Sequence, residues 1–402
     1  MEKRKKHFLL AVLSILMIVL SACSPNESID LNMAGTYAAQ TLAAMPTDTP
    51  LPSPTEPEPT ATPTEIFTPT PLPVVGVVGP VDFPEDVNPL TGLQVDDPSI
   101  LDRRPVFVKV ANYPVSGRPH AGLSKADMVF EYYIGSGGNR FIALYYGQDA
   151  DMIGPVRSGR QIDPYLVSLY EGIMGFEGAY ILIFEHIRDI LGNRAISGKD
   201  LCPGICDDGR NIVTSVFGDS EALTEIATRR GVVNQRYVLE GMAFDPDVPE
   251  GGQNADVIDI RFSQVNPSEW RYDEDSGLYL HWIDNETGQV IDLIPLVDRV
   301  NDQQLAFSNV AVIFVEHDEI APTWHDMSLW DNNAGQRAVV FRDGNAYDLT
   351  WRTRSRTQPI QFIDQAGEAF RLKPGNTWVV IMGLNSGVIL VDGTWTFNFF
   401  MP

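Results

Sequence analysis

The chain has 402 residues, of which 44% are hydrophobic, so it is long enough to build more than one hydrophobic core and is not disordered as a whole. It carries 53 acidic and 29 basic residues, a net charge of −24. A chain this acidic repels nucleic acid, so we expect no nucleic-acid partner, and any bound anion must be held by a local cluster of cations. The sequence shows no phosphate-loop, dinucleotide-binding or Gly-x-Ser-x-Gly fingerprint, and it predicts no metal and no cofactor.

The first 22 residues have the pattern of a secretory signal peptide. Residues 3–6 form a basic head and residues 8–20 an apolar run that is shorter than a membrane span needs. The closing Leu-Ser-Ala-Cys resembles a bacterial lipobox, which implies that residues 1–22 are removed and that Cys23 carries a lipid. The protein is therefore expected outside the cytoplasm, anchored by that lipid to the outer face of the cell membrane. The alternative is an ordinary cleaved signal with an accidental cysteine.

A segment rich in proline and threonine separates this leader from the rest of the chain. Residues 23–45 are Ala-rich without a clear apolar face, and we expect them to be a mobile, lipid-anchored N-terminus. Residues 46–73 hold ten prolines and eight threonines. In the polyproline II conformation they would span roughly 90 Å. Residues 46–80 are thus predicted to be a tether that lifts the folded part away from the membrane.

Residues 82–240 are predicted to form a mixed α/β domain. Stretches rich in β-branched and aromatic residues come first, and helical patterns follow them. Asp163-Pro164 is interpreted as the cap and first position of one helix, and Gly231 as the end of another. The strands are expected at residues 106–110, 128–134 and 140–146, with a hairpin at 135–138, and the helices at 163–174, 179–191 and 220–230.

Residues 256–402 are predicted to form a second, mostly β domain. Ile258, Ile260 and Phe262 alternate with polar residues, as in a half-buried strand. Asp343-Gly344 and Asp392-Gly393 lie between strand-like runs, where a tight hairpin needs them. The predicted fold class is therefore α+β, with a mixed α/β N-terminal domain followed by a mostly β C-terminal domain.

The strongest candidate for a binding site is the loop at residues 154–160, Gly-Pro-Val-Arg-Ser-Gly-Arg. Guanidinium groups match phosphate and carboxylate in shape and charge, and a helix is predicted directly after the loop. The same arginines can instead pair internally with Asp127, Glu131 and Asp163, and the sequence leaves both interpretations open. The candidate ligand-binding residues are Arg118, Glu131, Arg140, Arg157, Ser158 and Arg160.

Other reactive side chains have simpler explanations. Cys202 and Cys206 are expected to form a local disulfide across a Pro-Gly turn, with two free thiols as the alternative. Residues 316–319, Glu-His-Asp-Glu, lie close to His325, yet an acidic surface loop explains this grouping as well as a metal site does. Trp324 and Trp330 flank that histidine and fit either a sugar-binding face or a core.

Several motifs, in the same order along the chain, resemble the YerB-like lipoprotein family. They include Asn-Pro-Leu-Thr-Gly-Leu at 88–93, Gly-Leu-Ser-Lys-Ala-Asp at 122–127, the loop at 154–160 and Leu-Lys-Pro-Gly-Asn-Thr-Trp at 372–378. The resemblance covers roughly residues 86–385. It implies a lipid-anchored envelope protein with paired N- and C-terminal domains of unknown function, and no catalytic residue can be carried over. Where relatives tend to show Pro-His-Asn, this chain has Asp-Gly-Arg-Asn at 208–211.

Three functions fit these observations. The first is a non-enzymatic envelope protein that binds an anionic or cell-wall-derived ligand at the Arg-rich loop. The second is a hydrolase or transferase of envelope polymers, with Glu131 or Asp163 as acid or base. The third is a protein-interaction module of the envelope machinery, formed by the β-rich domain.

Overall fold

The computed structural model describes residues 76–210, 212–264, 266–285 and 292–401. The expected signal peptide, the lipid site Cys23 and most of the predicted tether lie outside the described residues. Among the residues that are described, no helix is long and apolar enough to cross a membrane.

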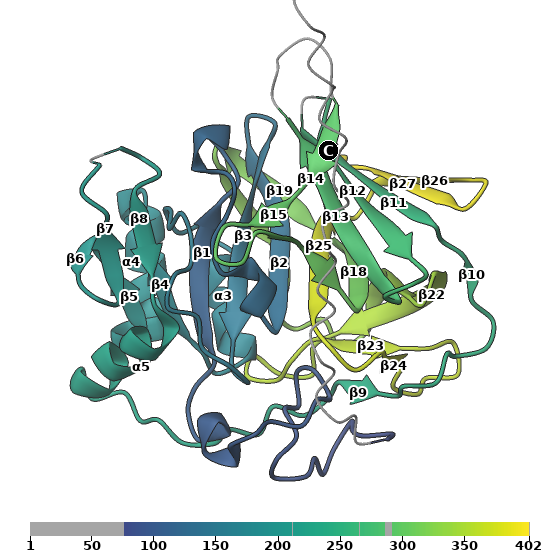
Figure 1. Cartoon of the computed structure of the whole chain (residues 1–402), viewed down its shortest axis with the longest axis horizontal. Coiled ribbons are helices and arrows are strands. Elements are labelled where there is room, and N and C mark those ends of the chain that lie inside the picture. The colour runs from purple at the N-terminus through teal and green to yellow at the C-terminus, as the bar shows by residue number, and fades with distance from the viewer. Residues whose placement is uncertain (1–75, 211, 265, 286–291, 402) are drawn as a thin grey trace, which may run out of the picture. The chain divides into compact units, whose positions relative to one another are not determined.

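The largest element is a sheet of eleven strands that draws on both predicted domains (Figure 1). Strand β2 lies parallel to β25, with Met128 opposite Thr377, and this pairing joins the two parts of the chain. The separation into domains at 82–240 and 256–402 stays a prediction. The strands are β1 (Val106–Ala111), β2 (Met128–Gly135), β3 (Gly138–Tyr145), β4 (Ile173–Phe176), β5 (Ala195–Ser197), β10 (Gln253–Asn254), β18 (Asn309–Val315), β21 (Gln336–Arg342), β22 (Asn345–Arg352), β23 (Gln361–Ile363) and β25 (Thr377–Gly383).

A second sheet of seven strands comes from the C-terminal part of the chain. The expected hairpins are confirmed: Asp343-Gly344 joins β21 to β22, and Asp392-Gly393 joins β26 to β27. All four turn residues have positive φ, between 46° and 78°, as a tight hairpin turn requires. The strands are β11 (Val257–Ser263), β12 (Asn266–Asp273), β13 (Leu278–Asp284), β14 (Leu293–Pro295), β17 (Ala306–Phe307), β26 (Gly387–Val391) and β27 (Thr394–Asn398).

Four small sheets complete the strand content. Within the first of them, Cys202 and Cys206 form a disulfide across the turn between β6 and β7. The strands are β6 (Asp200–Leu201), β7 (Ile205–Asp207) and β8 (Val216–Gly218); β9 (Ala243–Phe244) with β24 (Arg371–Leu372); β15 (Val297–Asp298) with β16 (Gln303–Gln304); and β19 (His317–Ala321) with β20 (Trp324–Met327).

The α-helices all come from the N-terminal part, and the described regular elements after residue 256 are strands, so the predicted α+β fold class is confirmed. The expected extent of the first helix was wrong. It ends at Leu169, because Glu171 adopts a left-handed φ of 54° and residues 173–176 then form β4. The helices are α3 (Asp163–Leu169), α4 (Ile181–Leu191) and α5 (Ser220–Arg229), with short 3₁₀ turns η1 (Pro98–Leu101), η2 (Val115–Gly117), η3 (Leu123–Lys125) and η4 (Gly192–Arg194).

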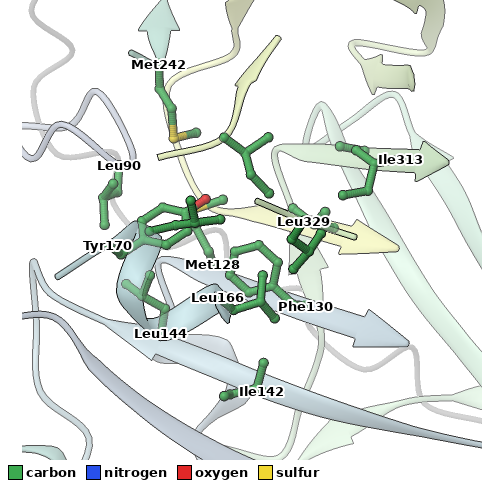
Figure 2. Packing of buried hydrophobic residues seen from close by; sticks show 14 of the residues in the cluster. Leu90, Met128, Phe130, Ile142, Leu144, Leu166, Tyr170, Met242, Ile313 and Leu329 are labelled. Atoms are coloured by element: carbon green, nitrogen blue, oxygen red, sulfur yellow. The ribbon is translucent and has the colours of Figure 1, made fainter. Parts of the chain in front are cut away.

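The eleven-stranded sheet has a separate hydrophobic core on each face, because side chains alternate along its strands. On one face, Phe130 and Ile142 point toward Leu166 and Tyr170 of the α3 region (Figure 2). On the other face, residues such as Phe141 pack in one cluster with residues of the second sheet. We call these the helix-covered face and the sheet-covered face. A polar side chain on a central strand therefore lies in one core or the other.

Candidate functional site

Three polar side chains interrupt the apolar rows on the helix-covered face. Arg140 of β3 lies opposite Tyr132 of β2 and opposite Ala111 of β1. Lys109 is two residues before Ala111, so it points to the same face. Lys109 and Tyr132 are fully buried and Arg140 is 7% exposed. Polar groups in such a position need partners, since burying them alone is costly.

Asp163, the first residue of α3, supplies the nearest negative charge. It is fully buried, lies 3.3 Å from the Lys109 ammonium and accepts a hydrogen bond from the Tyr132 hydroxyl. Its second oxygen accepts the backbone N–H of Arg160 at 2.6 Å. Asp163 was expected to cap the helix, but the cap position belongs to Ile162. The carboxylate closes the loop before the helix, and both of its oxygens are occupied.

The loop brings two more cations to this place, and Lys109, Arg140, Arg157 and Arg160 together are called the cationic cluster. In the described part of the chain, none of its three arginines lies within 4.0 Å of a carboxylate oxygen. Their hydrogen bonds go to backbone carbonyls instead. Arg140 and Arg160 both donate to the carbonyl of Ser158, at 2.8 and 3.3 Å. The Nε atoms of Arg157 and Arg160 are buried and have no partner.

The positive charges of the cluster disfavour one another. Burial, together with the charges of Arg160 and Arg157, lowers the pKa of Arg140 to about 9. The pKa of Lys109 falls to about 7, chiefly through burial and also through the charges of Arg140 and Arg160, while Asp163 raises it. Asp163 is ion-paired within the cluster and Glu177 acts on Arg157 from a longer distance, so four cations face two carboxylates in a strongly acidic protein.

Aromatic side chains surround the cluster. A small pocket is lined by Arg160, Tyr132 and His325, among others. Trp324 donates to the side chain of Gln161 at 3.3 Å, and Trp330 donates to the carbonyl of Tyr165 at 3.1 Å. Both tryptophans are half-buried and pack against the core of the helix-covered face. They connect the β19–β20 region to α3 and the loop that precedes it.

Arg118 does not belong to this cluster. It forms an ion pair with Asp284 of β13 at 3.2 Å, donates to the carbonyl of the same residue at 2.6 Å, and reaches the Asn112 side chain at 2.9 Å. The two ion-paired side chains are only 10% and 4% exposed. For this arginine the structure favours internal pairing, although its partner is not one of the carboxylates weighed from the sequence.

Glu131 is also separated from the arginines of the loop. It follows Phe130 on β2 and so points to the sheet-covered face, where it accepts hydrogen bonds from the indole of Trp378 at 2.8 Å and from the Asn139 amide. Burial raises its pKa to about 7. Because Arg140 points to the opposite face, Glu131 cannot serve as an acid or base for a ligand held there.

The remaining candidates have local explanations. Within the described residues, no group of three or more His, Cys, Asp or Glu side chains is arranged to hold a metal ion. His317 points inward, with its Nδ1 3.1 Å from the carbonyl of Val315. Asp127 accepts the backbone N–H groups of Tyr146 and Gly147 rather than an arginine.

Sequence reasoning missed Lys109 and Tyr132. Lys109 is the only charged residue in Val-Phe-Val-Lys-Val-Ala, a run that otherwise predicts a fully buried strand. A lone lysine in such a run needs a buried partner, and this signal could have found it. Tyr132 gave no comparable signal, because tyrosine is common in strands.

The fold is α+β, and its central sheet combines strands from both parts of the chain. Against one face of this sheet lie three largely buried arginines that have no ion pair in the described structure. Comparison with known proteins identifies the family. Two family models match the chain: "Protein of unknown function (DUF3048) N-terminal domain" at residues 90–233 and "Protein of unknown function (DUF3048) C-terminal domain" at residues 258–379. The chain belongs to this family. The predicted likeness to YerB is confirmed as well.

The curated relative is "Putative lipoprotein YerB" of Bacillus subtilis (strain 168). It is 26% identical over 309 residues, which cover 73% of this chain and 85% of the relative. The crystal structure of YerB from Bacillus subtilis has a TM-score of 0.60 at 24% identity and matches 74% of this chain and 96% of that one. At this identity the structural likeness supports the fold and nothing further.

Proposed function

We propose that this chain is a lipoprotein on the outer face of the cell membrane that binds an anionic ligand at the cationic cluster. The location is supported by the signal pattern of residues 1–22, by Cys23 in its lipobox-like setting, and by the name of the curated relative. The lipid on Cys23 is then its contact with the membrane.

The single observation that carries the binding proposal is the lack of carboxylate partners for three arginines. Elsewhere in the described chain, the partly buried Arg103, Arg104 and Arg118 are each ion-paired, whereas Arg194 and Arg299 donate only to backbone carbonyls. Arg140, Arg157 and Arg160 differ from both groups because three arginines without an ion pair lie together: Arg160 and Arg157 lower the pKa of Arg140, and Arg157 lowers that of Arg160. Uncompensated charge of this kind is costly in a protein interior and is typical of functional sites.

A bound anion would remove this cost. Phosphate or carboxylate oxygens accept charge-assisted, often bidentate hydrogen bonds from guanidinium groups, and they supply the negative charge that the backbone carbonyls now bonded to these arginines lack. The Ser158 carbonyl holds Arg140 and Arg160 side by side, so both can face one ligand. Because the protein as a whole is acidic, the site selects an anion by local contacts rather than by the overall field.

Ligands of this class are present at the proposed location, since phosphorylated glycans of the cell wall carry the required charge. The experiment is calorimetric titration of the full-length chain in detergent with inorganic phosphate, and then with wall glycan before and after removal of its phosphate. We expect binding that requires the phosphate. Replacing both Arg157 and Arg160 with alanine should weaken it at least about tenfold.

Arg229→Ala is the matched control, because Arg229 is an exposed arginine in a surface pair with Glu225 on α5. It should leave the affinity unchanged. Equal affinities of the wild-type chain and the double Arg157→Ala, Arg160→Ala variant would contradict the proposal, provided that circular dichroism shows both to be folded.

A further inference from the structure

A pocket lies away from the cationic cluster, lined by residues of β9, β23 and β24; these strands are neighbours in Figure 1. Its volume is about 630 Å³, within the range of small-molecule sites. Residues at alternate positions of adjacent extended segments line it, namely Gln361 and Ile363, Ala369 and Arg371, and Gly241 and Ala243. Side chains two apart on a strand share one face, so the pocket is built on one face of the adjacent segments β23, β24 and β9. The small side chains of Gly241, Ala243 and Ala369 leave space between these segments.

Two arginines at one end of the pocket lack a carboxylate partner. The β22–β23 register places Arg352 opposite Gln361, the first residue of β23, and its Nε donates to the Gln361 side chain at 3.2 Å. Arg354 follows on the loop after β22. Among the described residues, no acidic side chain is ion-paired with either one, whereas Arg371 in the same pocket is paired with Asp245 at 3.3 Å. Partial burial and the charge of Arg354 lower the pKa of Arg352.

Negative charge lies beyond the other end of β23. Thr350 is opposite Ile363, the last residue of this strand, and the turn that contains Glu368 begins directly after it. In the described structure, the carboxylates of Glu368 and Asp247, which both line the pocket, accept no hydrogen bond and form no ion pair. Glu368 therefore lies beyond one end of β23 and the two arginines lie at the other end, a separation of about the length of a three-residue strand, roughly 7–10 Å.

The charge balance narrows the chemistry of the ligand. Three arginines and five carboxylates line the pocket, a net charge of −2, which disfavours a phosphate or polyanion. The adjacent Arg352 and Arg354 disfavour a simple cation. A zwitterion satisfies both groups, and the amino and carboxyl ends of an extended dipeptide are about 7 Å apart.

We infer that this pocket binds a short peptide with free termini, its carboxylate against Arg352 and Arg354 and its ammonium group against Glu368. The side-chain amide of Gln358, which also lines the pocket, can bind the peptide group. This site is independent of the cationic cluster and of any anion bound there.

The test is calorimetric titration of the full-length chain in detergent with the dipeptide Ala-Ala, in its L,L and D,D forms. At least one form should bind, and the preferred form tells whether the ligand comes from proteins or from cross-linking peptides of the wall. N-acetyl-Ala-Ala and Ala-Ala amide, which each lack one terminal charge, should bind at least about tenfold more weakly.

Variants separate this site from the rest of the molecule. The double change Arg352→Ala with Arg354→Ala should weaken dipeptide binding at least about tenfold, as should Glu368→Gln. Arg337→Ala is the matched control, since Arg337 is an exposed arginine of β21 paired with Asp348, and it should have no effect. The Arg157→Ala, Arg160→Ala variant should bind the dipeptide with wild-type affinity, so the proposals for the two sites are tested independently of each other.

Three outcomes would overturn the inference. They are the absence of binding for both Ala-Ala forms at millimolar concentration, equal binding of the blocked peptides, and unchanged binding by folded variants of Arg352 and Arg354. Thermal unfolding followed by circular dichroism establishes that each variant is folded.

Discussion

Arginines on the two faces of the central sheet differ in how their charge is balanced. On the sheet-covered side, Arg118 has a nearly buried carboxylate, Asp284, as its partner. On the helix-covered side, the cationic cluster shares the single ion-paired carboxylate of Asp163. Arg118 thus joins two parts of the fold through an ion pair, whereas the three arginines of the cluster have no ion pair. The number of carboxylate partners, rather than the presence of arginine, separates an internal brace from a candidate binding site.

The largest effect on stability is expected when the ion pair between Arg118 and Asp284 is broken. Arg118→Met leaves the Asp284 carboxylate buried without its cation, which should lower the free energy of unfolding by about 4 kcal/mol. Urea denaturation of the full-length chain measures this change. Adding Asp284→Leu to the same chain should restore most of the loss, because the unpaired charge is removed. If the single variant is as stable as the wild type, Arg118 is not a brace.

Removing the shared carboxylate should have the next largest effect. Asp163→Asn leaves the cationic cluster without its ion pair and should cost about 3 kcal/mol, less than for Arg118 because Lys109 can lose its proton. Inorganic phosphate should then stabilise this variant more than it stabilises the wild type, as measured by thermal unfolding. A variant that phosphate does not stabilise would argue against an anion site.

The pH dependence of stability tests the charge state of Lys109. Its pKa is about 7 in the folded chain and 10.5 when exposed, so between these values the unfolded state binds more protons and stability rises with pH. From pH 7 to 9 this contribution is on the order of 2 kcal/mol. Lys109→Met should flatten the curve of unfolding free energy over this interval relative to the wild type. Identical slopes would show that the pKa of Lys109 is not lowered in the folded chain.

The smallest effect is expected for an arginine of the cluster itself. Arg140→Met removes one hydrogen bond to the Ser158 carbonyl but also relieves repulsion by Arg157 and Arg160, so stability should change by less than about 1 kcal/mol. Phosphate binding measured by calorimetry should nevertheless weaken. A loss of stability as large as that of Arg118→Met would remove the contrast between the two faces.

Much of the candidate site could be predicted from the sequence, and the errors in that prediction have a physical cause. Arg140, Arg157, Ser158 and Arg160 were expected together, and the structure brings them together. Arg118 and Glu131 were expected with them and lie elsewhere. A side chain on a central strand faces one of two cores, and which polar side chains meet in each core depends on what covers that face.

Local pattern alone determined strands β1, β2 and β3, the tight hairpins and the order of the family motifs. These features depend on residues close together in the chain: alternating apolar side chains, and Asp-Gly pairs that accept a positive φ. Only the tertiary structure decided that β2 pairs with β25, and that Arg118 meets a carboxylate 166 positions away. Such contacts are selected by the packing of whole sheets, so the balance of charge in each core is a property of the folded chain.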